Sequence, residues 1–356
     1  MNESNIFIIK QINKDNKYWY KKIFKKMLKF ESKKNIEVIL NSRILEVSNN
    51  KELIFKELYD ISLKNNINKL NLKNIIIEYK YIDNLTKILE QCALLFHLDL
   101  SSNHLGDYGI NKISRVLRQY SLIIYLDLSD NGIWLDSAES LSEVIKQYTS
   151  LEYLNLSTNY LRDDGILIIL QVISPTIIYI NFSLNWIGNK GIESLANYIV
   201  KYEALESLNL NMNIIKAEGA QILSQVLGKC NSLIHLDLGF NYLGDIGAES
   251  IANVLEQCYT LKNLYLNCNQ IGNEGTKSIA KNLGKCPSLE CINLSWNEIK
   301  EDGAMNLAEN LLNCWTLKYI NLSYNKINKL GTNALTKVHH LCPSIIYFDI
   351  SNQKKN

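Results

Sequence analysis

Apolar and polar positions along the chain repeat with a period of 28 residues. An asparagine marks each repeat, and apolar residues stand eight, five and three positions before it and two positions after it. We number positions from this marker, so that −3 is three residues before it and +2 is two residues after it. The markers are 28 residues apart except for one step of 26, and they are Asn103, Asn131, Asn159, Asn185, Asn213, Asn241, Asn269, Asn297 and Asn325.

Two periodicities within each repeat predict its elements. Alternation around positions −5 and −3 has the period of a short β-strand, whereas apolar residues at +7, +10 and +14 have helical spacing. Each repeat is therefore predicted to be a strand, a loop and a helix. Because every strand returns in the same direction through a helix, we expect a parallel sheet with right-handed crossovers.

The pattern L-x-x-L-x-L-x-x-N-x-L resembles leucine-rich repeats. The 28-residue period, the loop "NYLGDIGA" at 241–248 and a full helix per repeat resemble the ribonuclease-inhibitor-like class. This resemblance implies an α/β fold, a right-handed leucine-rich-repeat solenoid or horseshoe, with a parallel β-sheet on the concave face and helices on the convex face. The class includes enzyme inhibitors, GTPase-activating proteins, innate immune sensors and pathogen effectors, so it does not specify one function.

The repeats define three segments. Residues 66–353 are predicted to form about ten repeats and a terminal strand, with Gln353 in the last marker position, and residues 354–356 form a short polar tail. Residues 1–65 are expected to be a basic N-terminal helical cap, since residues 10–34 contain ten lysines against two acidic residues. An alternative for residues 10–34 is a basic amphipathic helix that binds an anionic membrane or an acidic partner. The 26-residue step predicts a shortened helix and a slight bend near Ile173.

Two further repeat positions are restricted in residue type. Glycine occupies +6 in eight of nine repeats, with Ser137 as the exception, and this indicates either close backbone packing or an unusual dihedral angle. Asp or Asn often stands at +4, where we expect it to cap the N-terminus of its own helix.

The cysteines and histidines do not predict a catalytic or metal site. Six of the eight cysteines stand at +17, where other repeats have tyrosine, so this is predicted to be a packing position of reduced thiols. His97 and His235 share position −6 but lie five repeats apart, about 25 Å at strand spacing. We expect no cofactor, no metal and no small-molecule substrate.

The open face of the predicted sheet carries the candidate binding residues. Side chains at −6, −4 and −2 point away from the core, and −1 and +1 lie at the rim of the sheet. From the fourth full repeat onward, position −1 is apolar. We predict that the partner-binding residues are Tyr125, Tyr153, Tyr179, Trp186, Met212, Phe240, Tyr242, Tyr265, Trp296, Tyr324, Asp99, Asp127 and Asp237. The alternative for the aromatic residues is packing against neighbouring loops.

Charge and apolar runs restrict the partner classes. The chain has 38 Lys and Arg against 36 Asp and Glu, so its net charge does not indicate nucleic-acid binding. No early apolar run is long enough for a secretory signal, which favours a cytoplasmic location, or the host cytosol for a translocated effector. We therefore expect a non-enzymatic module that binds a protein partner. The alternatives are a regulator of a small GTPase, of the Ran GTPase-activating type, and a bacterial effector or protist scaffold.

Overall fold

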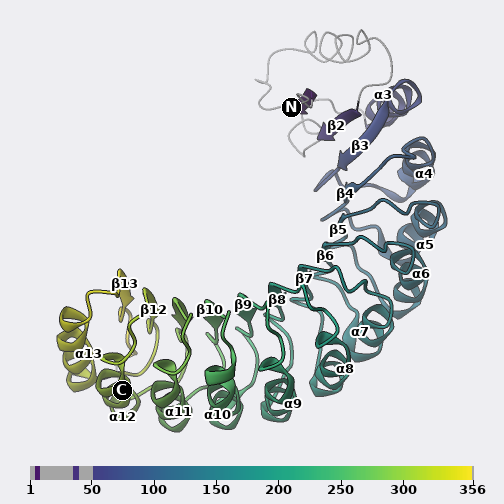
Figure 1. Ribbon diagram of the computed structural model, residues 1–356. Coiled ribbons are helices and arrows are strands. Elements are labelled where there is room, and N and C mark those ends of the chain that lie inside the picture. The colour runs from purple at the N-terminus through teal and green to yellow at the C-terminus, as the bar shows by residue number, and fades with distance from the viewer. Residues whose placement is uncertain (1–4, 9–34, 40–50, 355–356) are drawn as a thin grey trace, which may run out of the picture. The chain divides into compact units, whose positions relative to one another are not determined.

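The computed structural model describes residues 5–8, 35–39 and 51–354, and the chain divides into two compact units. The first unit comprises residues up to Tyr160 together with Val172–Ser174, and the second comprises Leu161–Gln171 and residues from Pro175 onward. In each unit the strands lie along one side and the helices along the other (Figure 1). Each unit therefore has the predicted succession of strand, loop and helix.

In the first unit the strands pair in parallel and in chain order. They are β1 (Asn5–Ile8), β2 (Asn35–Ile39), β3 (Asn66–Asn71), β4 (His97–Asp99), β5 (Tyr125–Asp127) and β6 (Tyr153–Asn155). The helices are α3 (Lys51–Lys64), α4 (Ile82–Glu90), α5 (Gly106–Leu117) and α6 (Leu135–Ile145), and the 3-10 helix η1 (Tyr79–Tyr81) precedes α4.

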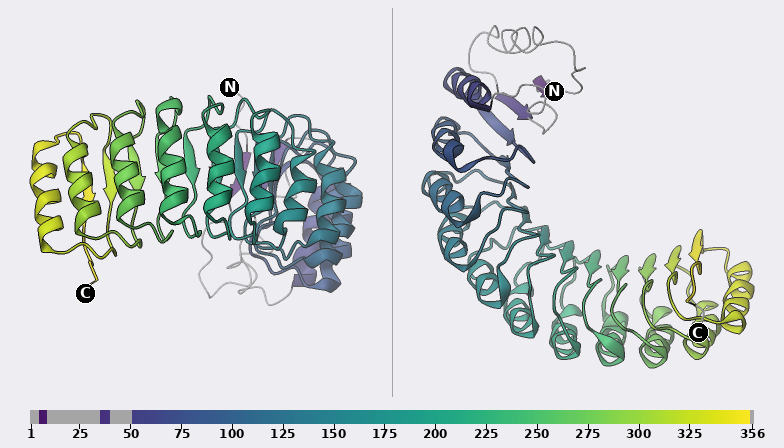
Figure 2. Two further views of the ribbon diagram at one scale, coloured as in Figure 1. Left: turned by 90° about the horizontal axis from the view of Figure 1, so that it is seen from below. Right: turned by 180° about the vertical axis from the view of Figure 1, so that it is seen from behind.

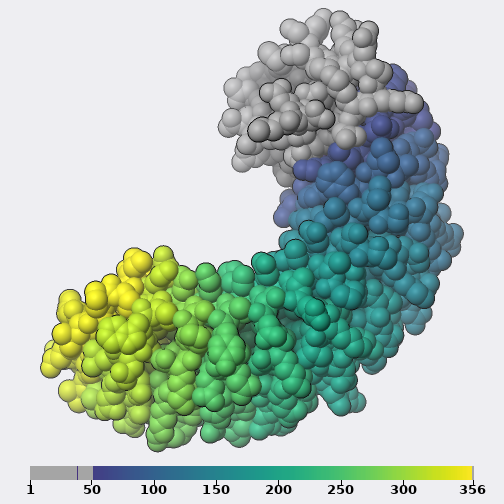
Figure 3. Space-filling view, viewed as in Figure 1, coloured from purple at the N-terminus to yellow at the C-terminus, as the bar shows by residue number. Residues whose placement is uncertain are grey.

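The second unit repeats this order (Figures 2 and 3). Its strands are β7 (Tyr179–Asn181), β8 (Ser207–Asn209), β9 (His235–Asp237), β10 (Asn263–Tyr265), β11 (Cys291–Asn293), β12 (Tyr319–Asn321) and β13 (Tyr347–Asp349). Its helices are α7 (Arg162–Leu170), α8 (Asn189–Ile199), α9 (Ala217–Leu227), α10 (Gly244–Val254), α11 (Asn273–Leu283), α12 (Glu301–Leu311) and α13 (Lys329–Leu341), and η2 (Leu255–Gln257) follows α10.

The segment before residue 66 differs from the expected helical cap. Strands β1 and β2 extend the parallel sheet ahead of β3, and α3 buries Ile54, Leu58 and Ile61. Residues 35–64 thus contain a strand followed by a helix, as a repeat does. The basic segment 10–34 lies outside the described residues. The short helix predicted at the 26-residue step is α7, which has nine residues, and the bend near Ile173 stays a prediction.

The core consists of the apolar repeat positions. Leucine or isoleucine at −5 and −3 is almost fully buried from β3 to β12, as are the helix residues that face the strands. In the repeat of Asn269 these residues are Leu264, Leu266, Ile271 and Ile279. Burial of such side chains, at about 1.5–3 kcal/mol each, is the main favourable contribution to folding.

Position +17 is a packing position, as predicted. The tyrosines there send their hydroxyl groups to a backbone carbonyl of the preceding helix, as Tyr148 does to Leu117 O at 3.1 Å and Tyr202 to Leu170 O at 2.8 Å. The cysteine thiols also lie against backbone carbonyls, and all eight cysteines are free. Burial raises the pKa of the Cys92 thiol to about 12, so this thiol stays protonated and unreactive at neutral pH.

The Asp and Asn residues at +4 cap the helix of the following repeat rather than their own. Asp245, in the first turn of α10, accepts hydrogen bonds from the backbone N–H groups of Gly272 at 2.7 Å and Gly275 at 2.9 Å, at the start of α11. Asn273 accepts from Lys300 and Gly303 at the start of α12 in the same way. Each cap therefore stabilises a helix N-terminus and also joins two repeats.

This cap explains the glycine at +6. The glycines with positive φ are Gly106, Gly132 and Gly244, which stand at other positions, so close packing is the reason for the +6 glycines. A Cβ added at Gly275 would lie 2.8 Å from Asp245 Oδ1 and 2.9 Å from Ile271 Cγ2. Ser137 fits the same position because its hydroxyl donates a hydrogen bond to the Asp107 carboxylate of the preceding repeat.

We predict that Gly275→Ala destabilises the protein by about 1–3 kcal/mol, because the added methyl group displaces the Asp245 cap and overpacks the helix start. In an ordinary helix interior the same substitution stabilises by roughly 0.5–1 kcal/mol, so the sign is informative. Denaturant unfolding measures the effect. Asp245→Ala is the matched control, and the double variant is expected to lose less than the sum of the two single losses because both changes affect one contact. An unchanged or increased unfolding midpoint for Gly275→Ala would contradict the packing argument.

Candidate functional site

The residues one position before the markers in the second unit form an exposed apolar column. We call this column the apolar rim. Its strongest members are Phe240, 46% exposed, and Trp296, 49% exposed, and the Trp296 ring stacks on Tyr324 with centroids 4.2 Å apart. The rim consists of Leu184, Met212, Phe240, Cys268, Trp296 and Tyr324. Phe240 and Trp296 thus lie at the surface, which does not fit the alternative of burial under neighbouring loops.

Every rim residue has a left-handed backbone. The φ angles lie between 53° and 57°, and each is fixed by a hydrogen bond to the next repeat, as when Trp296 N–H donates to Ser323 O at 2.9 Å. This conformation costs an L-residue with a bulky side chain roughly 1–2 kcal/mol and suits glycine or asparagine best. The backbone therefore gives no reason for Leu, Met, Phe, Trp or Tyr at this position. Their side chains must serve another purpose, and strained residues of this kind concentrate at functional sites.

A second column stands one position after each marker. It begins with Trp186, 56% exposed, and continues with Ile214 and Tyr242, which are also exposed. The next members are polar or charged, namely Gln270, Glu298, Lys326 and Lys354. Backbone hydrogen bonds hold this column from repeat to repeat, as between Tyr242 N–H and Ile215 O at 2.8 Å.

A hollow separates the two columns. It is lined on one side by Cys268, Trp296 and Tyr324 of the apolar rim, on the other side by the polar members of the second column, and at its base by Asn297. Lys326 pairs with Glu298 at 3.2 Å, and Lys354 Nζ lies 5.9 Å from the centre of the Trp296 ring. We call this hollow the rim groove.

The aspartates predicted as partner contacts are buried. Asp99 and Asp127 are each 5% exposed, because their side chains fold back onto the end of the strand. Asp127 Oδ1 accepts from the N–H and hydroxyl of Ser129, and Oδ2 accepts from Asn155 Nδ2 at 2.9 Å. Asp237 accepts from Gly239 N–H and Asn211 Nδ2 in the same manner. These carboxylates hold the turn after each strand, so we leave them out of the surface proposed below.

The predicted tyrosines on the sheet face are partly buried and do not all lie together. In the first unit Tyr125 stacks between His97 and Tyr153, with ring centroids 3.9 and 4.0 Å apart. In the second unit Tyr179 begins β7 and Tyr265 ends β10. Burial raises the pKa of the Tyr265 hydroxyl, and the neighbouring Cys291 acts in the same direction. The binding role of these four tyrosines stays a prediction.

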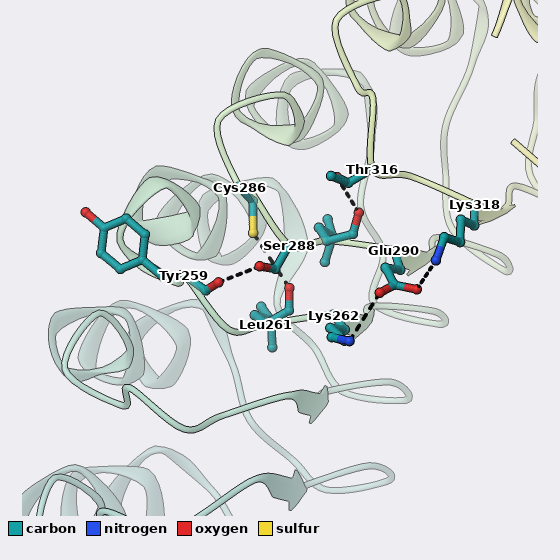
Figure 4. Close-up of polar contacts among 9 residues, drawn as sticks. Tyr259, Leu261, Lys262, Cys286, Ser288, Glu290, Thr316 and Lys318 are labelled. Atoms are coloured by element: carbon teal, nitrogen blue, oxygen red, sulfur yellow. Dashed lines mark hydrogen bonds and ion pairs between the residues drawn. The ribbon is translucent and has the colours of Figure 1, made fainter. Parts of the chain in front are cut away.

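A second hollow lies at the opposite edge of the repeats, where the helix leads into the next strand (Figure 4). Trp315, 81% exposed, forms part of it. Glu290 lies between Lys262 at 3.3 Å and Lys318 at 2.6 Å, and hydrogen bonds from Lys318 and then Lys262 lower the pKa of its carboxyl. The hydroxyls of Ser288 and Thr316 donate to backbone carbonyls of the preceding repeat. The polar groups of this hollow are therefore largely used to join repeats.

The described residues hold no cluster suited to a metal. Within residues 5–8, 35–39 and 51–354, no group of three or more His, Cys, Asp or Glu side chains could hold a metal ion. In the same part of the chain, no helix has both the length and the apolar character needed to cross a membrane.

Comparison with known proteins agrees with this architecture. A family model described as leucine-rich repeat matches residues 91–114, 174–196, 229–252, 257–280 and 285–308. The chain is a leucine-rich-repeat protein. No curated protein matches it.

Two solved structures are similar to this leucine-rich-repeat chain. One is a leucine-rich-repeat protein of Leptospira interrogans, with a TM-score of 0.50 and 19% identity over 84% of this chain and 75% of that one. The other is an internalin of Listeria monocytogenes, with a TM-score of 0.46 and 18% identity over 84% of this chain and 89% of that one. At this identity the Leptospira structure supports the fold alone.

Sequence reasoning missed two exposed residues, Ile214 and Trp315. Ile214 could have been found, because it stands at +1 between Trp186 and Tyr242. Trp315 stands at +18, where neighbouring repeats have Tyr259 and Pro287, and no periodic pattern distinguished this position.

We predict that Asp127→Asn changes the pH dependence of stability. Burial raises the pKa of the Asp127 carboxyl, against the hydrogen bonds from Ser129 and Asn155, with Asp99 adding to the rise. A carboxyl with a higher pKa in the folded chain than in the unfolded chain takes up a proton on folding, so the folded state gains stability as pH falls. Wild type should therefore gain relative to Asp127→Asn between pH 7 and pH 4 in denaturant unfolding.

Asp349, at the same repeat position, provides a control of opposite sign. Its partial burial is outweighed by hydrogen bonds from Ser351 and Tyr347, and the pKa of its carboxyl is lowered. Wild type should lose stability relative to Asp349→Asn as pH falls through that pKa. Equal pH dependence for the two variants would show that burial of Asp127 has no energetic consequence.

Proposed function

We propose that this protein is a non-enzymatic interaction module that binds a protein partner through the apolar rim and the exposed apolar residues beside it. The observation that carries the proposal is the left-handed backbone of the rim. Six apolar or aromatic residues occupy a conformation that disfavours them, and five of the six are exposed by more than a third. Exposed apolar surface of this extent is typical of interaction sites.

The residue types of the rim support a protein partner. Trp and Tyr are frequent among the residues that contribute most binding energy at protein interfaces, and Met adapts to varied apolar surfaces. Trp186, Tyr242, Trp296 and Tyr324 supply such anchors, with Phe240 and Met212 between them. Because the backbone hydrogen bonds between repeats fix their positions before binding, little entropy is lost on association.

We further propose the ribonuclease-inhibitor-like subtype for the repeats. The 28-residue period and the eleven-residue helices α8 to α12 support it. Regulation of a small GTPase, a role as an effector or scaffold, a cytoplasmic location and binding through residues 10–34 stay predictions, and none of them is favoured by an observation on the described residues.

Affinity capture with three variants tests the proposed function. Phe240→Glu and Trp296→Glu place a charge in the apolar rim, and Trp315→Glu places one on an equally exposed aromatic at the opposite edge. We expect at least one protein captured by wild type and by Trp315→Glu to be lost by about 10-fold or more with both rim variants.

Alkylation of Cys268, which lies in the rim between Phe240 and Trp296, gives an independent readout. The captured partner should slow labelling of this thiol while leaving Cys291 unaffected. Identical protein sets from wild type and all three variants would refute the proposed binding surface.

A further inference from the structure

We infer that the rim groove and the two columns beside it bind an amphipathic α-helix of the partner, lying along the direction in which the repeats succeed one another. The inference rests on the proposed protein-binding role of the apolar rim and adds the conformation of the bound segment. Three observations carry it, namely the spacing of the columns, the shape of the groove and the distribution of charge.

The spacing of the rim matches a helix better than a strand. Each repeat contributes one residue to the rim, held by a backbone hydrogen bond from Phe240 N–H to Asn267 O at 2.8 Å and by its equivalents in other repeats. Repeats joined in this way advance by about 5 Å, so the five steps from Leu184 to Tyr324 span about 25 Å.

A ligand helix stays in register over this length. Five helical turns rise about 27 Å, so one apolar residue per turn can meet one rim residue per repeat. An extended segment places alternate side chains about 6.8 Å apart, so five such steps span about 34 Å and fall out of register after two or three repeats. A helix of about 17 residues covers the rim from end to end.

The groove provides two walls of different character. The wall formed by Cys268, Trp296 and Tyr324 is apolar, whereas the opposite wall formed by Gln270, Glu298, Lys326 and Lys354 is polar. A helix with one apolar stripe and a polar flank can satisfy both walls at once, as in other complexes in which a helix lies in a groove.

The charge distribution defines the ends of the ligand. The second column is uncharged at Trp186, Ile214 and Tyr242, and its last three members, Glu298, Lys326 and Lys354, carry a net charge of +1 by count. Acidic residues of the helix are therefore expected over Lys326 and Lys354, and uncharged residues over the other end. This arrangement sets the direction of the helix along the groove.

Selection from patterned peptide libraries tests the inference. One displayed library of 17-residue peptides has apolar residues at i, i+3, i+4 and i+7, a second of equal composition alternates apolar and polar residues, and a third is unpatterned. The full chain is the target, Phe240→Glu/Trp296→Glu is the counter-target and Trp315→Glu is the control.

We expect the helical-pattern library to give clones that bind wild type and Trp315→Glu about 10-fold or more tighter than the rim variant. A proline in the middle of such a peptide should abolish most of its binding, because proline breaks a helix. Lys354→Glu should weaken clones that carry an acidic end.

The unfavourable outcomes separate the two proposals. Rim-dependent clones that come mainly from the alternating library, or that tolerate the central proline, would overturn the helical ligand and leave the rim as a binding surface. If no library, including the unpatterned one, yields rim-dependent clones, the helical ligand is overturned and the proposed function loses support as well.

Discussion

The buried asparagine ladder is the interaction on which the rest of this structure depends. Asn297 is 6% exposed, and its Oδ1 accepts the backbone N–H groups of Asn269 at 2.9 Å and Ile271 at 3.0 Å in the preceding repeat. Its Nδ2 donates to Leu266 O of that repeat and to Leu294 O of its own. One side chain thus satisfies four buried backbone groups that the sharp turn after the strand would otherwise leave unpaired. Gln353 does the same at the last repeat, where its Oε1 accepts from Ile327 N–H.

The ladder also determines what the surface can present. Because the asparagine ties the turn to its neighbours, the residue before it is held in a left-handed conformation and its side chain is directed outward. In the first unit this position holds Ser102, Asp130 and Thr158, whereas in the second unit it holds the apolar rim. The same turn therefore serves as plain scaffold in one unit and presents anchors in the other. Interaction capacity is added through residue type alone, without a change in backbone.

The sequence was sufficient to predict the repeat, the strands, the helices and the core, because each depends on periodicities within 28 residues. It was insufficient where the relevant neighbour is one repeat away. The cap by Asp245 on α11 and the packing reason for Gly275 depend on contacts across 27 and 30 residues, which a local capping rule assigns to the wrong helix. Alternation along the strand placed Asp127 on the open face, but its hydrogen bonds to Ser129 and Asn155 fold it inward. The abundance of lysine in residues 10–34 drew attention away from the short strands β1 and β2 on either side.

Native-state hydrogen exchange of Asn297→Ala tests the role of the ladder most directly. Removing the amide leaves the N–H groups of Asn269 and Ile271 without their acceptor, at a cost of about 1–3 kcal/mol for each buried group. We predict that these two amides exchange about 10-fold or more faster than in wild type, whereas the amide of Leu210, two repeats away, keeps its protection. Unchanged protection at Asn269 and Ile271 would contradict the claim that the asparagine ladder holds the turns, and with them the apolar rim, in place.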